Sequence, residues 1–142
     1  GNVIYENGIP VKLLTEAGYV TLADSKYHYF VQDHLGNNRV VVDQSGNVEE
    51  VNHYYPFGGL LSSSVSNAVQ PYKYNGKELD RKNGLDWYDY GARMYDAALG
   101  RWHAVDPMSE KYYSISSYVY GLNTPHNCID PDGRRLFLLM GI

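Results

Sequence analysis

Residues 33–58 decide the fold, and they read DHLGNNRVVVDQSGNVEEVNHYYPFG. Asp33–Asn37 contains the residue types that form tight turns, and the β-branched run Arg39–Asp43 is typical of a strand. Ser45–Asn47 predicts a second tight turn, and Val48–Tyr55 predicts the returning strand. Strands joined by such short turns pair in an antiparallel meander.

The same alternation of turns and strands continues on both sides of this stretch. Asn7–Gly8 is a hairpin-turn dipeptide, and Leu61–Gln70 has no clear period and is interpreted as a loop. Further short strands are predicted at Val11–Leu14, Tyr19–Leu22, Tyr27–Val31, Leu85–Tyr90 and Ala92–Tyr95, and Leu99–Trp102 predicts a turn into another strand. Ser109–Tyr120 is expected to hold a short helix. We therefore predict a mainly β chain with one or two short helices, with an α+β fold as the alternative.

The composition fits this prediction and excludes several classes of protein. The 142 residues include 15 tyrosines and 14 glycines against only 3 phenylalanines, which favours strands with polar edges over a helical bundle. The net charge of −4 argues against a nucleic-acid binder. The single cysteine, Cys128, excludes an internal disulfide framework and a cysteine-based zinc site. No apolar run is long enough to span a membrane, and neither a metal nor a cofactor is predicted.

Three stretches together carry a resemblance to a known family. The first is Asp33–Asn37 followed by Tyr54–Gly58, and the second is Tyr90–Trp102. The third is Val105–Pro107, then Tyr118–Tyr120, then Ile129–Gly133. In this order and spacing they resemble the Rhs/YD-repeat proteins and their repeat-associated core domain. The resemblance implies a degenerate upstream repeat at 1–26, YD-repeat-like β units at 27–80, the core domain at 81–134 and the start of a variable segment or tail at 135–142.

The resemblance also implies a location and a role. Members of this family are large exported or cell-surface proteins of bacteria, and their repeats build a spiralling β-sheet shell that encloses a variable C-terminal segment, often a toxin. We therefore expect a structural end-piece of such a shell, secreted or at the cell surface. Its partner would be the remainder of its own longer chain, and the isolated piece would associate with itself through open strand edges.

A second interpretation, also implied by the resemblance, is a self-cleaving aspartyl protease. Two carboxylates that share a proton activate water and polarise a carbonyl group. By resemblance these are Asp96 and Asp106, with Arg93 to orient them, and the cut falls after Arg134. Asp-Pro and Asp-x-x-Gly sequences also form ordinary turns, so the structural role is favoured over the enzyme.

A third interpretation is a module that binds carbohydrate or a cell surface. Exposed aromatic rings stack on the C–H faces of sugars, and the candidate residues are Trp87, Tyr88 and Trp102. Aromatic residues that alternate along a strand also form cross-strand pairs that stabilise a sheet. The exposure of these three rings therefore separates the two interpretations.

Overall fold

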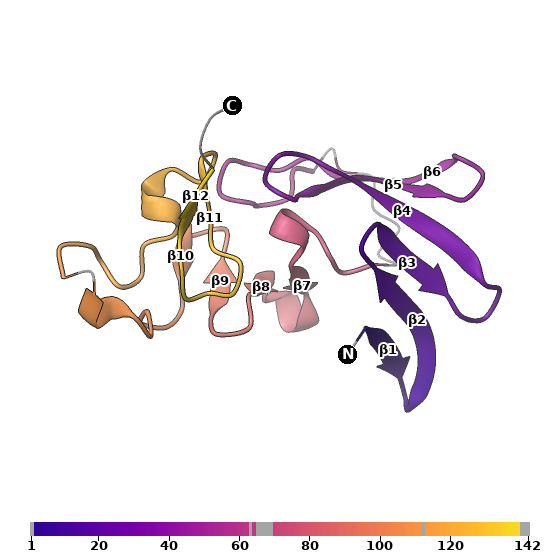
Figure 1. The fold of residues 1–142 in the computed structure, drawn as a ribbon, viewed down its shortest axis with the longest axis horizontal. Coiled ribbons are helices and arrows are strands. Elements are labelled where there is room, and N and C mark those ends of the chain that lie inside the picture. Colours follow the sequence, from indigo (N-terminus) through magenta and orange to yellow (C-terminus); the bar gives the residue numbers. More distant parts are fainter. Residues whose placement is uncertain (1, 63, 65–69, 112, 140–142) are drawn as a thin grey trace.

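The chain is built from short strands and single 3-10 turns (Figure 1). A computed structural model describes residues 2–62, 64, 70–111 and 113–139. Within these ranges no helix exceeds three residues, so the prediction of a mainly β chain is confirmed. The helix expected within Ser109–Tyr120 is reduced to one 3-10 turn, Ser109–Lys111, and residue 112 lies outside the described residues.

The first half of the chain forms one six-stranded antiparallel sheet in which the strands follow sequence order. Its turns use the residues that tight hairpins require: Asn7 and Gly8 both have positive φ, 52° and 80°. The predicted meander is therefore confirmed, and it begins upstream of residue 27. The strands are β1 (Val3–Glu6), β2 (Ile9–Thr15), β3 (Gly18–Thr21), β4 (Lys26–Gln32), β5 (Asn38–Asp43) and β6 (Val48–Val51).

An aspartate caps each of the two tight turns within residues 33–58. Oδ1 of Asp33 accepts the backbone N–H groups of the residues two and four positions further on, at 3.0 and 3.1 Å. Asp43 repeats this arrangement at 2.8 and 2.9 Å. Hydrogen bonds from Asn47 lower the pKa of the Asp43 carboxyl group. The recurring Asp-x-x-Gly-Asn pattern is thus a turn code that fixes the register of β4, β5 and β6.

The second half of the chain forms two smaller sheets and carries 3-10 turns at 74–76, 82–84, 109–111 and 121–123. A four-stranded antiparallel sheet has the order β10-β9-β8-β7, and a separate pair joins β11 and β12. The strands are β7 (Glu78–Asp80), β8 (Trp87–Asp89), β9 (Met94–Asp96), β10 (Arg101–Trp102), β11 (Cys128–Ile129) and β12 (Phe137–Leu138). The loop predicted at Leu61–Gln70 falls largely on residues outside the described ranges.

The core of the second half consists mainly of aromatic rings. Its buried members are Tyr74, Leu79, Tyr88, Tyr90, Tyr95, Trp102 and Tyr120. Each of the five tyrosine hydroxyls in this cluster donates to a hydrogen-bond acceptor, as buried polar groups require. Three successive carbonyl groups of Pro56–Gly58 accept the hydroxyls of Tyr74, Tyr95 and Tyr88 at 2.7–3.3 Å. The tyrosines therefore fill the core and also bind the segment that leaves the first sheet.

Gly58 is required at the centre of this contact. Its φ is +94°, and a Cβ atom added there would lie 2.6 Å from ring carbons of Tyr74. Only glycine combines this backbone conformation with such a close approach. The Tyr-Pro-Phe-Gly sequence thus belongs to the packing of the aromatic core.

Candidate functional site

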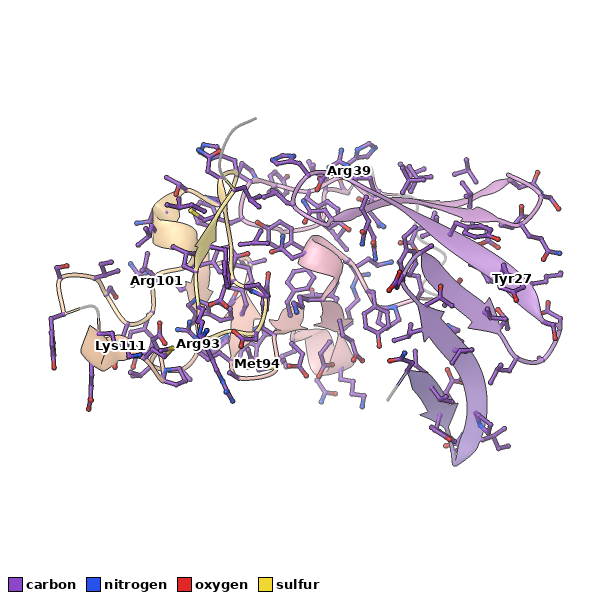
Figure 2. The ribbon with its side chains drawn as sticks, in the orientation of Figure 1. Tyr27, Arg39, Arg93, Met94, Arg101 and Lys111 are labelled. Atoms are coloured by element: carbon purple, nitrogen blue, oxygen red, sulfur yellow. The ribbon has the colours of Figure 1, made fainter. Side chains whose placement is uncertain are left out.

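Arg93 lies at the centre of the most concentrated charged site in the described residues. It directly precedes β9 in the half of the molecule that holds the aromatic core (Figure 2). Its side chain is only 3% exposed, and the guanidinium carbon lies 4.1 Å from the centre of the Trp102 ring. Burial lowers the pKa of Arg93, while the charges of Asp106 and Asp130 act in the opposite direction. The indole and the two carboxylates together hold the guanidinium in one orientation.

Two carboxylates share the same guanidinium nitrogen. Nη2 of Arg93 lies 3.5 Å from Oδ2 of Asp106 and 3.3 Å from Oδ2 of Asp130. Asp106 also caps a turn, because its Oδ1 accepts the N–H of Met108 at 2.8 Å. One buried cation therefore pairs two carboxylates from separate parts of the chain.

Asp130 anchors the turn that contains the Asp-Pro-x-Gly motif. Its Oδ1 accepts backbone N–H groups from four residues, Asp132 to Arg135, at 2.8–3.4 Å. Burial raises the pKa of this carboxyl group, and the backbone hydrogen bonds and Arg93 oppose that effect. From the sequence, Asp130 was expected only as part of a turn, and its contact with Arg93 was not predicted. The Asp-Pro-x-Gly spacing was the sequence signal for this role, because the backbone N–H groups of such a turn need an acceptor.

Arg93 also binds the main chain close to Arg134, the residue after which cleavage is predicted. Its Nε donates to the carbonyl oxygen of Gly133 at 2.6 Å, and Nη1 donates to the Ser117 carbonyl at 3.2 Å. A pocket of about 210 Å³ opens beside this contact, with Arg93, Asp106, Asp130 and Arg134 in its lining. The site can therefore polarise a main-chain carbonyl group next to two carboxylates.

Asp96 occupies a different environment from Asp106. Its Oδ1 accepts the N–H groups of Ala98 and Leu99 at 2.9 and 3.1 Å, which caps the turn before β10. Its Oδ2 lies 3.6 Å from Nε2 of His103. Of the three catalytic residues that the protease hypothesis names, Arg93 and Asp106 are thus in direct contact, whereas Asp96 lies beside His103.

Two of the three rings named for sugar binding are enclosed by the protein. Tyr88 is 1% exposed and donates its hydroxyl to the Gly58 carbonyl, and Trp102 is 4% exposed beneath Arg93. Trp87 is half-buried and packs on the His103 ring, with the ring centres 3.4 Å apart. These aromatic residues therefore pack within the sheet and core, and the sugar-binding hypothesis stays a prediction.

The described ranges contain no group of three or more His, Cys, Asp or Glu side chains that could hold a metal ion. Over the same ranges no helix is long and apolar enough to cross a membrane.

Comparison with known proteins identifies the fold built from these elements. A sequence model of the Teneurin YD-shell family matches residues 15–125, which include four of the six strands of the first sheet and the buried residues of the aromatic core. The chain belongs to the Teneurin YD-shell family. The resemblance to YD-repeat proteins is therefore confirmed, and the tyrosine-rich core is part of a YD-shell.

The YD-shell relatives are much longer than this chain. Salivary gland surface protein 1 of Aedes aegypti is 40% identical over 113 residues, which are 78% of this chain and 3% of that protein. Toxin subunit YenC1 of Yersinia entomophaga is 29% identical over 150 residues, or 94% of this chain and 15% of the subunit. The crystal structure of TcdB2-TccC3 matches 91% of this chain and 7% of that chain with a TM-score of 0.72. At 21% identity, this last likeness shows the fold alone.

Proposed function

We propose that this chain is the end-piece of an exported YD-shell. The six-stranded sheet forms part of the shell wall, and the aromatic half, which is the second half of the chain with the aromatic core, closes that wall. The observation that carries the proposal is the open state of the sheet. In the described residues, β1 and β6 each have a strand neighbour on one side only. Unpaired strand edges template further pairing, and the partner is the remainder of the same longer chain.

The exposed face of the sheet supports the same role. Large apolar side chains on β2, β4 and β6 are solvent-exposed in this chain: Leu13, Tyr27, Tyr29, Val31 and Val48. Figure 2 labels Tyr27 on β4, at the end of the molecule away from the aromatic half. In a repeat architecture each unit leaves apolar surface that its neighbours cover.

Asn75 connects this wall to the aromatic half. Its Nδ2 donates to the Leu35 carbonyl at 2.8 Å, which ties it to the turn between β4 and β5. Its Oδ1 accepts the hydroxyls of Tyr90 and Tyr120 at 2.7 and 2.6 Å. The sheet and the core are therefore joined by a partly buried polar contact, as a wall and its closing piece need to be.

Export follows from the same proposal. The YD-shell relatives include a surface protein and a toxin subunit, by their names. We place this chain outside the cell or on its surface, where a closed shell would enclose a following segment of the same chain. The proposal that the shell encloses this segment is tested directly by measuring whether the segment is protected from added protease in the intact protein.

The oligomeric state of residues 1–142 tests the open edges. We expect concentration-dependent self-association in size-exclusion chromatography with light scattering, because the edges of β1 and β6 can pair between copies. Tyr5→Lys with Val48→Lys should reduce it, since both side chains are 61% exposed on the edge strands. Leu99→Lys is the matched control, exposed but in a turn away from the first sheet. A monodisperse monomer at high concentration would contradict the open-edge account.

A second candidate function is self-cleavage by an aspartyl protease after Arg134. It is favoured by one contact, the hydrogen bond from Arg93 Nε to the Gly133 carbonyl beside two carboxylates. The intact mass of the protein, followed for days between acidic and neutral pH, tests it. A product ending at Arg134 that is absent from Asp106→Asn supports the protease, and the Asp96→Asn variant shows whether that carboxylate takes part. A stable full-length mass contradicts it.

A further inference from the structure

A second buried polar cluster lies between the sheet and the aromatic half. It contains Glu50 on β6, Asn52 just after β6, Gln70, and Lys73 directly before the 3-10 turn at Tyr74–Gly76. All four residues are at most 3% exposed. The proposed shell function makes no chemical use of them, and buried charged groups are costly unless they are paired.

Three nitrogen atoms in this cluster converge on one carboxylate oxygen. Oε1 of Glu50 accepts hydrogen bonds from Nδ2 of Asn52, from Nε2 of Gln70 and from Nζ of Lys73. The lysine amine and the asparagine amide are therefore both within hydrogen-bond reach of the same oxygen atom. This convergence brings an amine, an amide and a proton acceptor together in a site that excludes water.

The environment also favours the chemistry of a nucleophilic amine. Burial lowers the pKa of Lys73, and the hydrogen bond and charge of Glu50 oppose that shift. A desolvated lysine that gives up its proton becomes a nucleophile. Within the described residues, Oδ1 of Asn52 has no hydrogen-bond partner although it is fully buried. A buried oxygen atom without a hydrogen-bond partner is uncommon. No hydrogen bond at Oδ1 therefore has to break when the amide group of Asn52 reacts.

We propose that Lys73 and Asn52 form an intramolecular isopeptide bond, with Glu50 as the proton carrier. The ammonium group of Lys73 first gives one proton to Glu50, and the lone pair that this frees on Nζ attacks Cγ of Asn52. Glu50 then delivers a proton to Nδ2, the Cγ–Nδ2 bond breaks, and ammonia leaves. Nζ loses its second proton to the departing ammonia, so the products are a Lys–Asn amide and an ammonium ion. No oxidant or reductant is consumed, and Glu50 ends as the carboxylate that it was at the start.

The bond would join the two halves of the chain covalently. It connects the residue that follows β6 to the residue that begins the aromatic half, and it closes the loop between positions 52 and 73. A cross-link of this kind restricts the unfolded chain in the same way as a disulfide, and it does so without cysteine. It would hold the wall against its closing piece under reducing and oxidising conditions alike.

Peptide mapping by mass spectrometry tests the proposal on purified protein that contains residues 1–142. We expect a branched peptide that joins Asn52 to Lys73, about 17 Da lighter than the sum of its two parts because ammonia has left. Asn-Gly sequences lose the same mass when they form succinimides, and the chain has them at Asn7, Asn75 and Asn83. The branched fragment ions, and the persistence of the mass loss at mildly alkaline pH, distinguish the isopeptide bond from a succinimide.

Two variants and a control assign the roles. Lys73→Arg and Glu50→Gln should give only linear peptides, whereas Lys82→Arg, which changes an exposed lysine, should keep the branched peptide. Only linear peptides from the unaltered protein would overturn the proposal, and this result does not depend on the folding of any variant. A branch at Gln70 would overturn the assignment of Asn52, and a branch that persists in Glu50→Gln would overturn the role of the carboxylate.

Discussion

Replacing Asn75 with alanine should lower the free energy of unfolding, because it removes the hydrogen bonds that join the first sheet to the aromatic core. The side chain of Asn75 donates to the Leu35 carbonyl and accepts the hydroxyls of Tyr90 and Tyr120. The two hydroxyls also lie 3.1 Å from each other, so one of them can donate to the other after the substitution. One buried hydroxyl and one carbonyl group then lose their partner.

The magnitude follows from these losses. An unpaired buried hydroxyl costs about 1–3 kcal/mol, and the lost bond to the Leu35 carbonyl adds about 1 kcal/mol. Asn75 has a φ of 49°, and alanine in this conformation costs roughly a further 1 kcal/mol. Asn83→Ala is the matched control, because Asn83 sits in the same kind of Asn-Gly turn at a φ of 55° and is exposed. The difference between the two variants should be about 2–4 kcal/mol.

Urea unfolding followed by near-ultraviolet circular dichroism measures this difference, because that signal comes from the packed tyrosines. The free energy of unfolding of Asn75→Ala should fall below that of Asn83→Ala, with the transition midpoint lower by about 1–2 M urea. Equal losses in the two variants would refute the reasoning, because they would show that the turn conformation alone accounts for the effect of Asn75.

Three further predictions concern the core and the charged site. Gly58→Ala should lose about 2–4 kcal/mol of unfolding free energy in urea, since its Cβ meets the Tyr74 ring, whereas Gly36→Ala, at a φ of +75° with open space, should lose only about 1 kcal/mol. Burial raises the pKa of Tyr74 to about 12, so unfolding releases phenolic protons above pH 10. The free energy of unfolding should therefore be retained below pH 10 and fall as the pH rises further, and absorbance at 295 nm should show tyrosines that titrate only on unfolding. Arg93→Met should lose about 3–5 kcal/mol at pH 7 in thermal or urea unfolding, because two carboxylates lose their cation. A smaller loss is expected at acidic pH, because burial raises the pKa of Asp130 and its protonation removes one of the two negative charges.

The first sheet could be predicted from sequence because its signals are local. Asn7–Gly8 and the two Asp-x-x-Gly-Asn turns fix where strands end, and β-branched runs fill the intervals. The helix expected within Ser109–Tyr120 was wrong beyond its first turn. Extended and turn conformations are favoured by Ser114, Ile115 and Ser116. Packing of the chain around Trp102 determines the conformation of the remaining residues.

The charged site could be predicted only in part, because it depends on contacts that are distant in sequence. Arg93 and Asp106 were named by resemblance, but the contact of Arg93 with Asp130 spans 37 positions. From the sequence, Trp102 was a candidate to stack on a sugar ring, whereas the fold buries it under Arg93. The cluster around Glu50 has no local sequence signal at all, since its members come from segments on either side of a long connection.

The most direct test of the account is a cryo-electron microscopy structure of the longest protein that carries this chain. We predict that β1 and β6 both pair with strands from the rest of that chain in a continuous wall, with the tyrosine core at one end. A six-stranded sheet that stands alone, with both edges in solvent and no neighbouring strands, would contradict it.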